Sequence, residues 1–488
     1  MKCTHVRRVA IATTVAAIAI TPGLGRPAHA QPSRPAASSA RSARSARAGD
    51  FDGDGKVDLA IGAPGSNRVR VSYTHARPAG SAVQFLTPSK ASYHYSMMFG
   101  SAIAVGDFNG DGFSDLAVGA PDYAWPPFDP GDPPPTQGAV FLFHGSAHGL
   151  VADPLTISGP VDTSDSFHLG DDLAAADMNG DGRADLAVHV GGDDYEEIRL
   201  YHGSTHGLRS SGYQTFDDYD ADALAFGDVD GDGHVDLVAG STTDLSNPHD
   251  YDYGDVEVFH GTRHGISASH PQRIRGDQVG IGQNLGSAVA VGDLNRDGYN
   301  DVVVGAADDT TDSAAGTIVV LFGSRHGLSA HHRQLIHERD IYPNARSGNE
   351  FGSTLRLAKI SGRRYPELVV GAAGEQVSRH PQAGAVYLLR GTSKGLSTHH
   401  VQRITAATHG VPGSPTTQAR FGTAIYTDRL LGSDKHADLV IGAPGASAGA
   451  TRGGQAVILR GRSTGISTAH AQSVGDNLRD DTLGTAIG

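Results

Sequence analysis

Five short acidic segments share one spacing of oxygen donors, D-x-[DN]-x-D-G-x-x-D. Oxygens at the first, third, fifth and ninth positions, with glycine at the sixth for a sharp turn, suit a hard cation such as Ca²⁺. The seventh residue would add its backbone carbonyl, whatever its side chain. We therefore predict about five structural calcium ions, and no catalytic residue or organic cofactor. The predicted ligand sets are Asp50, Asp52, Asp54, Lys56, Asp58; Asp107, Asn109, Asp111, Phe113, Asp115; Asp177, Asn179, Asp181, Arg183, Asp185; Asp228, Asp230, Asp232, His234, Asp236; and Asp293, Asn295, Asp297, Tyr299, Asp301.

Two other interpretations of these loops are less favourable. An EF-hand requires glutamate at the twelfth position and a following helix, whereas here the twelfth residues are apolar and lie in predicted strands: Ile61, Val118, Val188, Ala239 and Val304. Metal-free Asp/Gly turns are the second alternative, but three or four carboxylates within nine residues would repel one another without a cation. Mg²⁺ demands a tighter octahedron and usually keeps several waters. Calcium is therefore the preferred ion.

Two further loops depart from the pattern. In the sixth, Lys359, Ser361, Arg363 and Glu367 take the equivalent positions. The two cations should exclude Ca²⁺, and we predict that Lys359 or Arg363 pairs with Glu367. The seventh keeps Asp428, Asp434 and Asp438 but contains a two-residue insertion, so calcium binding there is left open.

The loops belong to a unit that recurs seven times. The loops start near residues 50, 107, 177, 228, 293, 359 and 428, a mean step of 63 residues. Each unit contains short apolar runs broken by Gly, Asp and Pro, which indicate four strands; in the second unit they are residues 99–107, 114–120, 138–145 and 155–159. Since no stretch has sustained helical periodicity, we predict an all-β, seven-bladed β-propeller with four-stranded blades.

The two ends of the repeat region complement each other. The first unit, starting at residue 50, lacks the opening strand, and the final LGTAIG (483–488) matches the opening FGSAIA (99–104) of the second. The C-terminal strand should therefore close the ring, which removes open sheet edges. Residues 49–488 would then form one domain, with small residues such as Ala102, Ala104 and Gly106 in the crowded strands near the axis.

The repeated motif resembles the FG-GAP repeat of integrin α-subunit propellers and of bacterial secreted relatives. The phrases that carry this resemblance are Phe99-Gly100 with Gly119-Ala120-Pro121, and Phe421-Gly422 with Gly442-Ala443-Pro444. The resemblance implies calcium loops on one face and ligand recognition usually on the opposite face. Integrins carry calcium only in some late blades, whereas here the first five loops are intact. Integrin leg domains, transmembrane helix and partner subunit have no counterpart, so receptor signalling is not carried over.

The first 48 residues read as export and spacer segments. Residues 1–30 combine a basic start, an apolar run at 9–20 and Ala28-His29-Ala30, the pattern of a secretory signal peptide. Cleavage there would remove Cys3, the single cysteine. Residues 31–48 are rich in Ser, Ala and Arg, which favours a disordered linker. We therefore predict a secreted, extracellular protein.

The charge balance limits the choice of partners. The net charge is −14, and residues 1–48 contain eight Lys or Arg and no acid, so the remainder stands at −22. A protein with this much negative charge is not expected to bind nucleic acid or to insert into a membrane. We predict a monomeric, non-catalytic binding or adhesion module for an extracellular protein or glycan. The alternatives are a hydrolase-associated protein, because FG-GAP repeats also occur in glycosylphosphatidylinositol-specific phospholipase D, and a lectin.

Several smaller motifs carry less weight. Residues 391–395 and 461–465 spell G-x-S-x-G, but they align with the turn at 144–150 and not with a strand-to-helix elbow. In the same turn, His148, His206, His264 and His326 recur, and we assign them a turn-stabilising role. Arg275-Gly276-Asp277 is an integrin-binding tripeptide by spelling only. Loops at 125–135, 191–197 and 244–254 are rich in Asp, Pro and aromatic residues, including Trp125, Tyr251 and Tyr253, and are candidates for a binding face.

Overall fold

The computed structural model describes most of the repeat region. The described residues are 48–74, 82–88, 96–124, 136–159, 166–192, 196–217, 219–243, 253–309, 315–431, 434–448, 451–475 and 482–488. The predicted signal peptide, most of the predicted linker and the loops that contain Trp125 and Tyr251 lie outside these residues.

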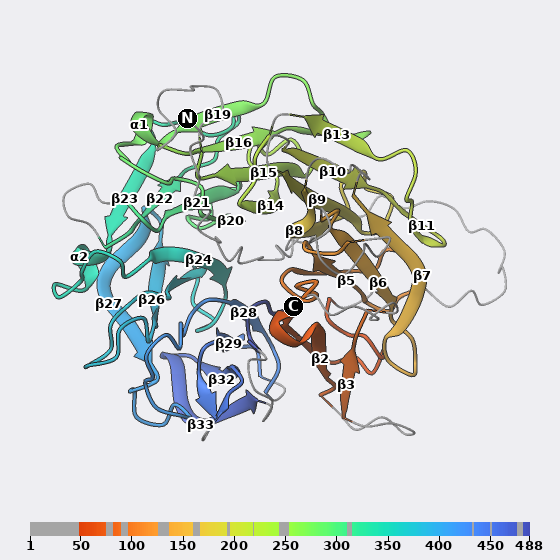
Figure 1. The fold of residues 1–488 in the computed structure, drawn as a ribbon. Coiled ribbons are helices and arrows are strands. Elements are labelled where there is room, and N and C mark those ends of the chain that lie inside the picture. Colours follow the sequence, from red (N-terminus) through yellow and green to blue (C-terminus); the bar gives the residue numbers. More distant parts are fainter. Residues whose placement is uncertain are drawn as a thin grey trace, which may run out of the picture.

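Seven antiparallel sheets, or blades, surround one axis (Figure 1). Blade 1 contains β1 (Leu59–Ala63), β2 (Arg68–Ser72) and β3 (Val83–Leu86). Blade 2 contains β4 (Ile103–Gly106), β5 (Asp115–Ala120), β6 (Ala139–His144) and β7 (Val151–Ser158). Blade 3 contains β8 (Phe167–Ala176), β9 (Asp185–Gly192), β10 (Glu197–Tyr201) and β13 (Gln214–Asp217). Blade 4 contains β14 (Ala223–Gly227), β15 (Asp236–Ser241), β16 (Asp255–Phe259) and β19 (Gln272–Arg275).

The last three blades follow the same order. Blade 5 contains β20 (Ala288–Gly292), β21 (Asp301–Ala306), β22 (Thr317–Leu321) and β23 (Arg333–His337). Blade 6 contains β24 (Phe351–Ala358), β25 (Glu367–Ala372), β26 (Ala385–Thr392) and β27 (Gly395–Thr405). Blade 7 contains β28 (Ile425–Asp428), β29 (Asp438–Ala443), β32 (Gln455–Arg462) and β33 (Gly465–Gly475). The predicted seven-bladed propeller is confirmed.

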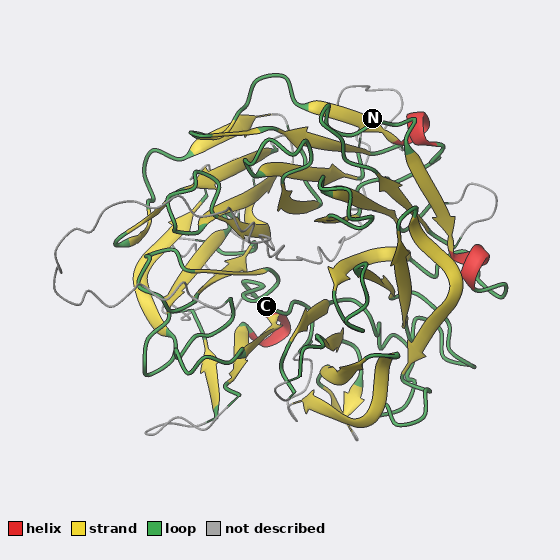
Figure 2. Ribbon diagram, turned by 180° about the vertical axis from the view of Figure 1, so that it is seen from behind, coloured by secondary structure: helices red, strands yellow, loops and turns green. Residues whose placement is uncertain are grey.

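Few elements lie outside the blades (Figure 2). Three two-stranded ladders are formed by β11 (Gly203–Ser204) with β12 (Gly207–Leu208), β17 (Gly261–Thr262) with β18 (Gly265–Ile266), and β30 (Ser447–Ala448) with β31 (Thr451–Arg452). The helical turns are η1 (Pro64–Ser66), α1 (Gly276–Val279) and α2 (Glu338–Ile341). Among the described residues, no helix is long and apolar enough to span a membrane.

The hydrophobic core is divided among the blade interfaces. The second strand of each blade is buried along its whole length, as in β5 and β21, because it is covered on both faces by neighbouring blades. Seven apolar clusters result, each joining two adjacent blades. Since side chains from two blades fill each cluster, adjacent blades stabilise one another.

Glycine pairs set the closest approach between blades. A Cβ atom on Gly62, Gly119, Gly240, Gly305, Gly371 or Gly442 would lie 2.0–2.5 Å from the carbonyl oxygen of a glycine in the next blade. The partners are, in the same order, Gly100, Gly170, Gly286, Gly352, Gly422 and Gly484. The first glycine comes from the GAP part of the repeat and the second from the FG part. The glycines of the FG and GAP parts of the repeat thus allow adjacent blades to pack closely against each other.

A glutamine from the outer strand of one blade also binds the next blade. The side chain of Gln334 donates from Nε2 to the Leu396 carbonyl at 2.8 Å, and its Oε1 accepts from the Leu396 N–H at 2.8 Å. Gln272 and Gln402 make the same two bonds to Leu328 and Ile466. These contacts join outer strands to the turn between the third and fourth strands of the next blade.

The C-terminal residues complete blade 1. The Ala60 N–H donates to the Gly488 carbonyl at 2.8 Å, and the Gly62 N–H donates to the Ala486 carbonyl at 2.8 Å. Ile61 lies opposite Ile487 in an antiparallel bridge, as Val118 lies opposite Ile103 in blade 2. The predicted register of the closing strand is therefore confirmed, and Figure 1 shows this end of the chain inside the ring.

Candidate metal-binding loops

The acidic loops of blades 2–5 connect the first and second strands of their blades, and the loop of blade 1 leads into β1, its second strand. They therefore lie on one face of the propeller, together with the turns between third and fourth strands. The described strands agree with the four segments predicted for each unit. The local fold of each loop follows from its sequence: glycines at positions such as Gly110 and Gly112 adopt positive φ angles of 74° and 91°, which L-residues with a Cβ rarely adopt.

Backbone N–H groups of each loop point at its own acidic side chains. In blade 2, Asp107 accepts from the N–H groups of Gly110 at 2.7 Å, Asp111 at 3.1 Å and Gly112 at 2.9 Å. The fifth-position Asp111 accepts from Phe113 at 2.9 Å. The loops of blades 3, 4 and 5 repeat most of these bonds. The side chains are thereby held with their remaining oxygen lone pairs directed into the loop.

The ninth-position aspartates are buried and tie the loop to the third strand. Asp236 accepts one hydrogen bond from Val229 N–H at 2.8 Å and one from Gly261 N–H at 2.7 Å. Asp58, Asp115, Asp185 and Asp301 make the equivalent pairs of bonds. Asp301 accepts a third bond, from Asn295 N–H to the same Oδ2 that binds Leu294 N–H.

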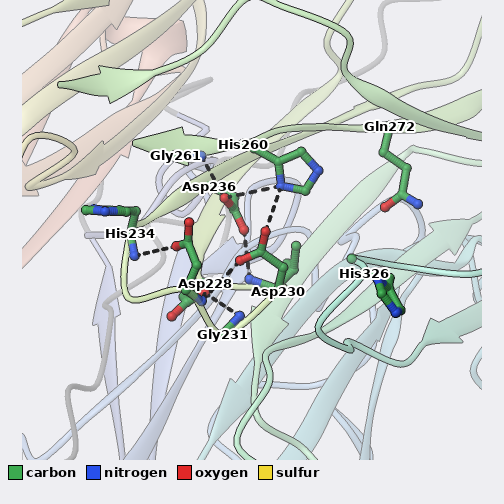
Figure 3. Close-up of polar contacts among 12 residues, drawn as sticks. Asp228, Asp230, Gly231, His234, Asp236, His260, Gly261, Gln272 and His326 are labelled. Atoms are coloured by element: carbon green, nitrogen blue, oxygen red, sulfur yellow. Dashed lines mark hydrogen bonds and ion pairs between the residues drawn. The ribbon is translucent and has the colours of Figure 1, made fainter. Parts of the chain in front are cut away.

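Three carboxylates converge in two of the loops. In blade 4, ligand atoms of Asp228, Asp230 and Asp236 all lie within 4.8 Å of one another (Figure 3), and in blade 1 the same holds for Asp50, Asp52 and Asp58. The Oδ1 atom of Asp50 is buried and has no hydrogen-bond partner. In blades 2, 3 and 5 the third position is Asn109, Asn179 or Asn295, which contributes an amide instead of a third carboxylate.

Burial makes these carboxylates unfavourable when no positive charge is near. Desolvation is the largest cause that raises the pKa of Asp58 and Asp301 to about 7 and that of Asp236 to about 6. Repulsion from neighbouring carboxylates, such as Asp52 on Asp58, raises these pKa values further. Protonation of these carboxylates, or binding of a cation to them, would remove the cost of burying their negative charges close together.

A histidine beside three of these loops was not identified from the sequence. His144 ends β6, and His202 and His260 directly follow β10 and β16. Their Nδ1 atoms lie 3.3, 3.3 and 3.6 Å from a ninth-position aspartate oxygen. Figure 3 shows His260 between Asp230 and Asp236. In the sequence, these histidines can be recognised by the His-Gly dipeptide that recurs at 144–145, 202–203 and 260–261.

The sixth and seventh loops differ from the acidic five. The predicted ion pair of Glu367 with Lys359 or Arg363 is wrong: Glu367 is buried and accepts hydrogen bonds from both the N–H and the hydroxyl of Ser361. The fifth-position side chain of Arg363 is exposed to solvent. In the seventh loop, Asp438 accepts from Leu430, Leu431 and Gly461. Asp434 instead pairs with Arg460 at 3.0 Å.

The turns between third and fourth strands are closed by side-chain hydroxyl groups. Residues 391–395 join β26 directly to β27, which excludes a nucleophile elbow there. The hydroxyls of Ser146, Ser204, Thr262, Ser324 and Thr392 donate to the carbonyl three residues later at 2.7–2.9 Å. These hydroxyls close the turns. In the same turns the imidazoles of His206, His264 and His326 bond to the side chain of the preceding residue at 2.9–3.2 Å. The turn-stabilising role of His148, His206, His264 and His326 stays a prediction.

The Arg275-Gly276-Asp277 tripeptide lies at the start of α1. Its two charged side chains bind each other at 3.0 Å.

A further titratable cluster lies between blades 3 and 4. His189 stands where other blades have the GAP glycine, and its Nε2 lies 2.9 Å from Glu196 and 3.7 Å from Asp220. Burial lowers the pKa of His189, but the hydrogen bond with Glu196 and the nearby carboxylates outweigh this and raise it to about 9. The cluster is thus an imidazolium neutralised by carboxylates.

Comparison with known proteins agrees with this geometry. Residues 42–81, 99–143 and 285–321 match the FG-GAP repeat, and residues 177–239 match an FG-GAP-like repeat. The chain carries FG-GAP repeats. The FG-GAP propeller is 28% identical over 283 residues to "Integrin alpha pat-2" of Caenorhabditis briggsae and 26% identical over 328 residues to "Integrin alpha-PS5" of Drosophila melanogaster. It is also 35% identical over 152 residues to "Phosphatidylinositol-glycan-specific phospholipase D" of Homo sapiens.

These similarities cover parts of larger proteins. The three alignments include 57, 62 and 28% of this chain, but only 18, 29 and 17% of the respective relatives. The resemblance to an integrin α-like FG-GAP propeller is therefore confirmed for the fold. What the relatives do as whole proteins does not follow from it.

Proposed function

We propose that this FG-GAP propeller is a secreted, calcium-stabilised, non-catalytic binding module for an extracellular protein or glycan. The secretory pattern of residues 1–30 supports export. The similarity to integrin α propellers supports a binding role. The acidic loops would hold Ca²⁺ through the ligand sets given above, and the ion would supply the positive charge that stabilises the loops.

The observation that carries the calcium proposal is the convergence of carboxylates in blades 1 and 4. Three acidic side chains lie within 4.8 Å of one another in each, although burial and mutual repulsion raise the pKa of several of them. The buried Oδ1 of Asp50 accepts no hydrogen bond from the protein. These oxygens fit a divalent cation. Their number, together with the seventh-position carbonyl, favours Ca²⁺ over Mg²⁺.

Calcium removal tests this proposal. We expect the midpoint of thermal unfolding to fall when EDTA replaces about 1 mM Ca²⁺, since an ion at 100 times its Kd stabilises the folded state by about 2.7 kcal/mol per site. Equilibrium dialysis should count about five ions per chain. An identical melting curve with and without EDTA would refute the proposal.

A comparison of two variants tests whether the acidic loop of blade 4 binds calcium. Asp232→Asn retains an oxygen that can accept from His234 N–H, which now lies 2.8 Å from Asp232 Oδ1, but removes the charge. Combined with Asp230→Asn, it should lower the calcium count by one. The control is Asp217→Asn, an exposed aspartate of β13 outside the loops. Equal counts in the two variants would contradict calcium binding by blade 4.

The ligand-binding face is proposed to be opposite the acidic loops. Loops between second and third strands, and between successive blades, lie at that end of every sheet. A glycan array and an unbiased pull-down with Trp125→Ala, Tyr251→Ala and Tyr253→Ala variants would test it. Loss of binding in these variants supports the proposal. Turnover of a phospholipid or polysaccharide would instead favour the hydrolase alternative.

A further inference from the structure

Blade 6 replaces the acidic loop of its neighbours with a basic one. Counting from the ninth position, Arg363 stands where the other loops have the fifth-position aspartate, and Arg364 stands where they have the turn glycine. Both side chains are exposed. The face that is acidic in blades 1–5 is therefore basic here, in a chain whose net charge is −14.

These arginines line a groove with a third arginine, Arg390, and two histidines. The groove has a volume of about 420 Å³ and lies between this loop and the turn that joins β26 to β27. Its charged and titratable lining consists of Arg363, Arg364, Tyr365, Arg390, His399 and His400. No Asp or Glu belongs to this lining. Such a volume is large enough for a substituted monosaccharide.

Within the described part of the chain, the arginines of the groove have no carboxylate partner at salt-bridge distance. Blade 7 provides the comparison, because Arg460 occupies the position of Arg390 and binds Asp434 at 3.0 Å. In blade 6 the residue corresponding to Asp434 is Arg363. The nearest acid of the loop, Glu367, is buried and bonded to Ser361, although it lines a smaller adjoining groove of about 230 Å³ with Arg390.

The acidic loop of blade 5 contacts this basic loop. Arg296, in the acidic loop of blade 5, donates from Nη1 to the backbone carbonyl of Arg364 at 3.1 Å. His400 adopts a positive φ of 57° in the irregular part of β27, and the groove includes both His399 and His400. The lining of the groove therefore contains three arginines and no acid, although Glu367 lies opposite Arg390 in the register of β25 and β26.

We propose that this groove of blade 6 binds the oxyanion of a phosphate or sulfate monoester carried by a small sugar. A planar guanidinium presents a fork of N–H donors that matches two oxygens of such a group. A bound anion would also relieve the mutual repulsion of Arg363, Arg364 and Arg390. This site goes beyond the proposed function, because it lies on the face of the acidic loops and not on the opposite face.

Calorimetric titration of the full chain in calcium-containing, low-salt buffer tests the inference. The probes are glucose 6-phosphate and glucose 6-sulfate, with glucose as the neutral comparison. We expect saturable binding of at least one ester and none of glucose. The Arg363→Gln, Arg390→Gln double variant should bind at least tenfold more weakly, equivalent to about 1.4 kcal/mol. The matched control is Arg462→Gln, an exposed arginine of β32 in blade 7.

Folding is monitored by the melting curve of each variant. Should the double variant melt early, the single Arg364→Gln variant, at an exposed position, carries the test with the same expected weakening. A preference for one ester supports the inference and identifies the oxyanion. Absence of saturable binding for both esters, equal affinity in the groove variants, or equal weakening by Arg462→Gln would overturn it. None of these outcomes depends on the ligand of the opposite face.

Discussion

The substitution Gly442→Ala should weaken the closure of the ring. Gly442 lies in β29, and a Cβ atom there would be 2.0 Å from the carbonyl oxygen of Gly484. An ordinary contact requires at least about 3.4 Å, so the closing strand must move by more than an ångström. That strand is held to β1 by backbone bonds of 2.8–3.0 Å from Ala60, Gly62, Gly484 and Gly488.

The expected loss combines overpacking with weakened hydrogen bonds. Overpacking costs about 1–3 kcal/mol, and loss of one or two backbone bonds adds about 1 kcal/mol each, so we expect a fall of roughly 2–5 kcal/mol in the free energy of unfolding. Urea unfolding followed by far-ultraviolet circular dichroism measures the shift in midpoint.

A matched alanine variant controls for the change in backbone freedom. Gly475, at the end of β33, has no atom closer than 3.8 Å to a built Cβ, and Gly475→Ala should leave stability unchanged or raise it by about 0.4–1 kcal/mol. If Gly442→Ala unfolds at the same urea concentration as Gly475→Ala, the closing contact does not limit stability and the reasoning is wrong.

Three further perturbations have defined outcomes. The folded pKa of His189, about 9, exceeds its ordinary 6.5, so the free energy of unfolding should fall as pH rises from 6.5 to 9, by up to roughly 3 kcal/mol. His189→Gln should flatten this slope in urea titrations at each pH, and an unchanged slope would contradict the assignment. Burial raises the pKa of Glu338 to about 7 from 4.5, so its protonated form stabilises the fold at low pH and this contribution is lost between pH 4.5 and 7. The Glu338→Gln variant should not lose stability over this pH range. If its free energy of unfolding changes with pH as steeply as that of the wild type, the role assigned to Glu338 is wrong. Gln334→Ala removes two bonds to Leu396 and should cost about 1–3 kcal/mol, whereas truncation of the exposed Val151 should cost little; equal midpoints for the two variants would argue against the inter-blade bond.

The blades and loops could be predicted because every repeat carries the same information. The register of Ile61 with Ile487 followed from aligning one unit with the chain end. The Glu367 prediction failed because it used charge alone, whereas the backbone of the sixth loop places Ser361 at the carboxylate and Arg363 in solvent. The His189 cluster could not be predicted from one unit, because Glu196 and Asp220 reach it from a loop and from the next blade.

The contact between Ile61 and Ile487 also bears on the order of assembly. These residues are more than 400 positions apart in the chain, and long-range pairing of this kind slows folding because loop-closure entropy opposes it. Blade 1 has only three strands of its own, so its inner edge stays unpaired until residues 484–488 have been synthesised. Until then the chain would expose a sheet edge that is prone to pairing with other chains. Pairing of residues 484–488 with β1 thus removes an edge through which the folding chain could aggregate.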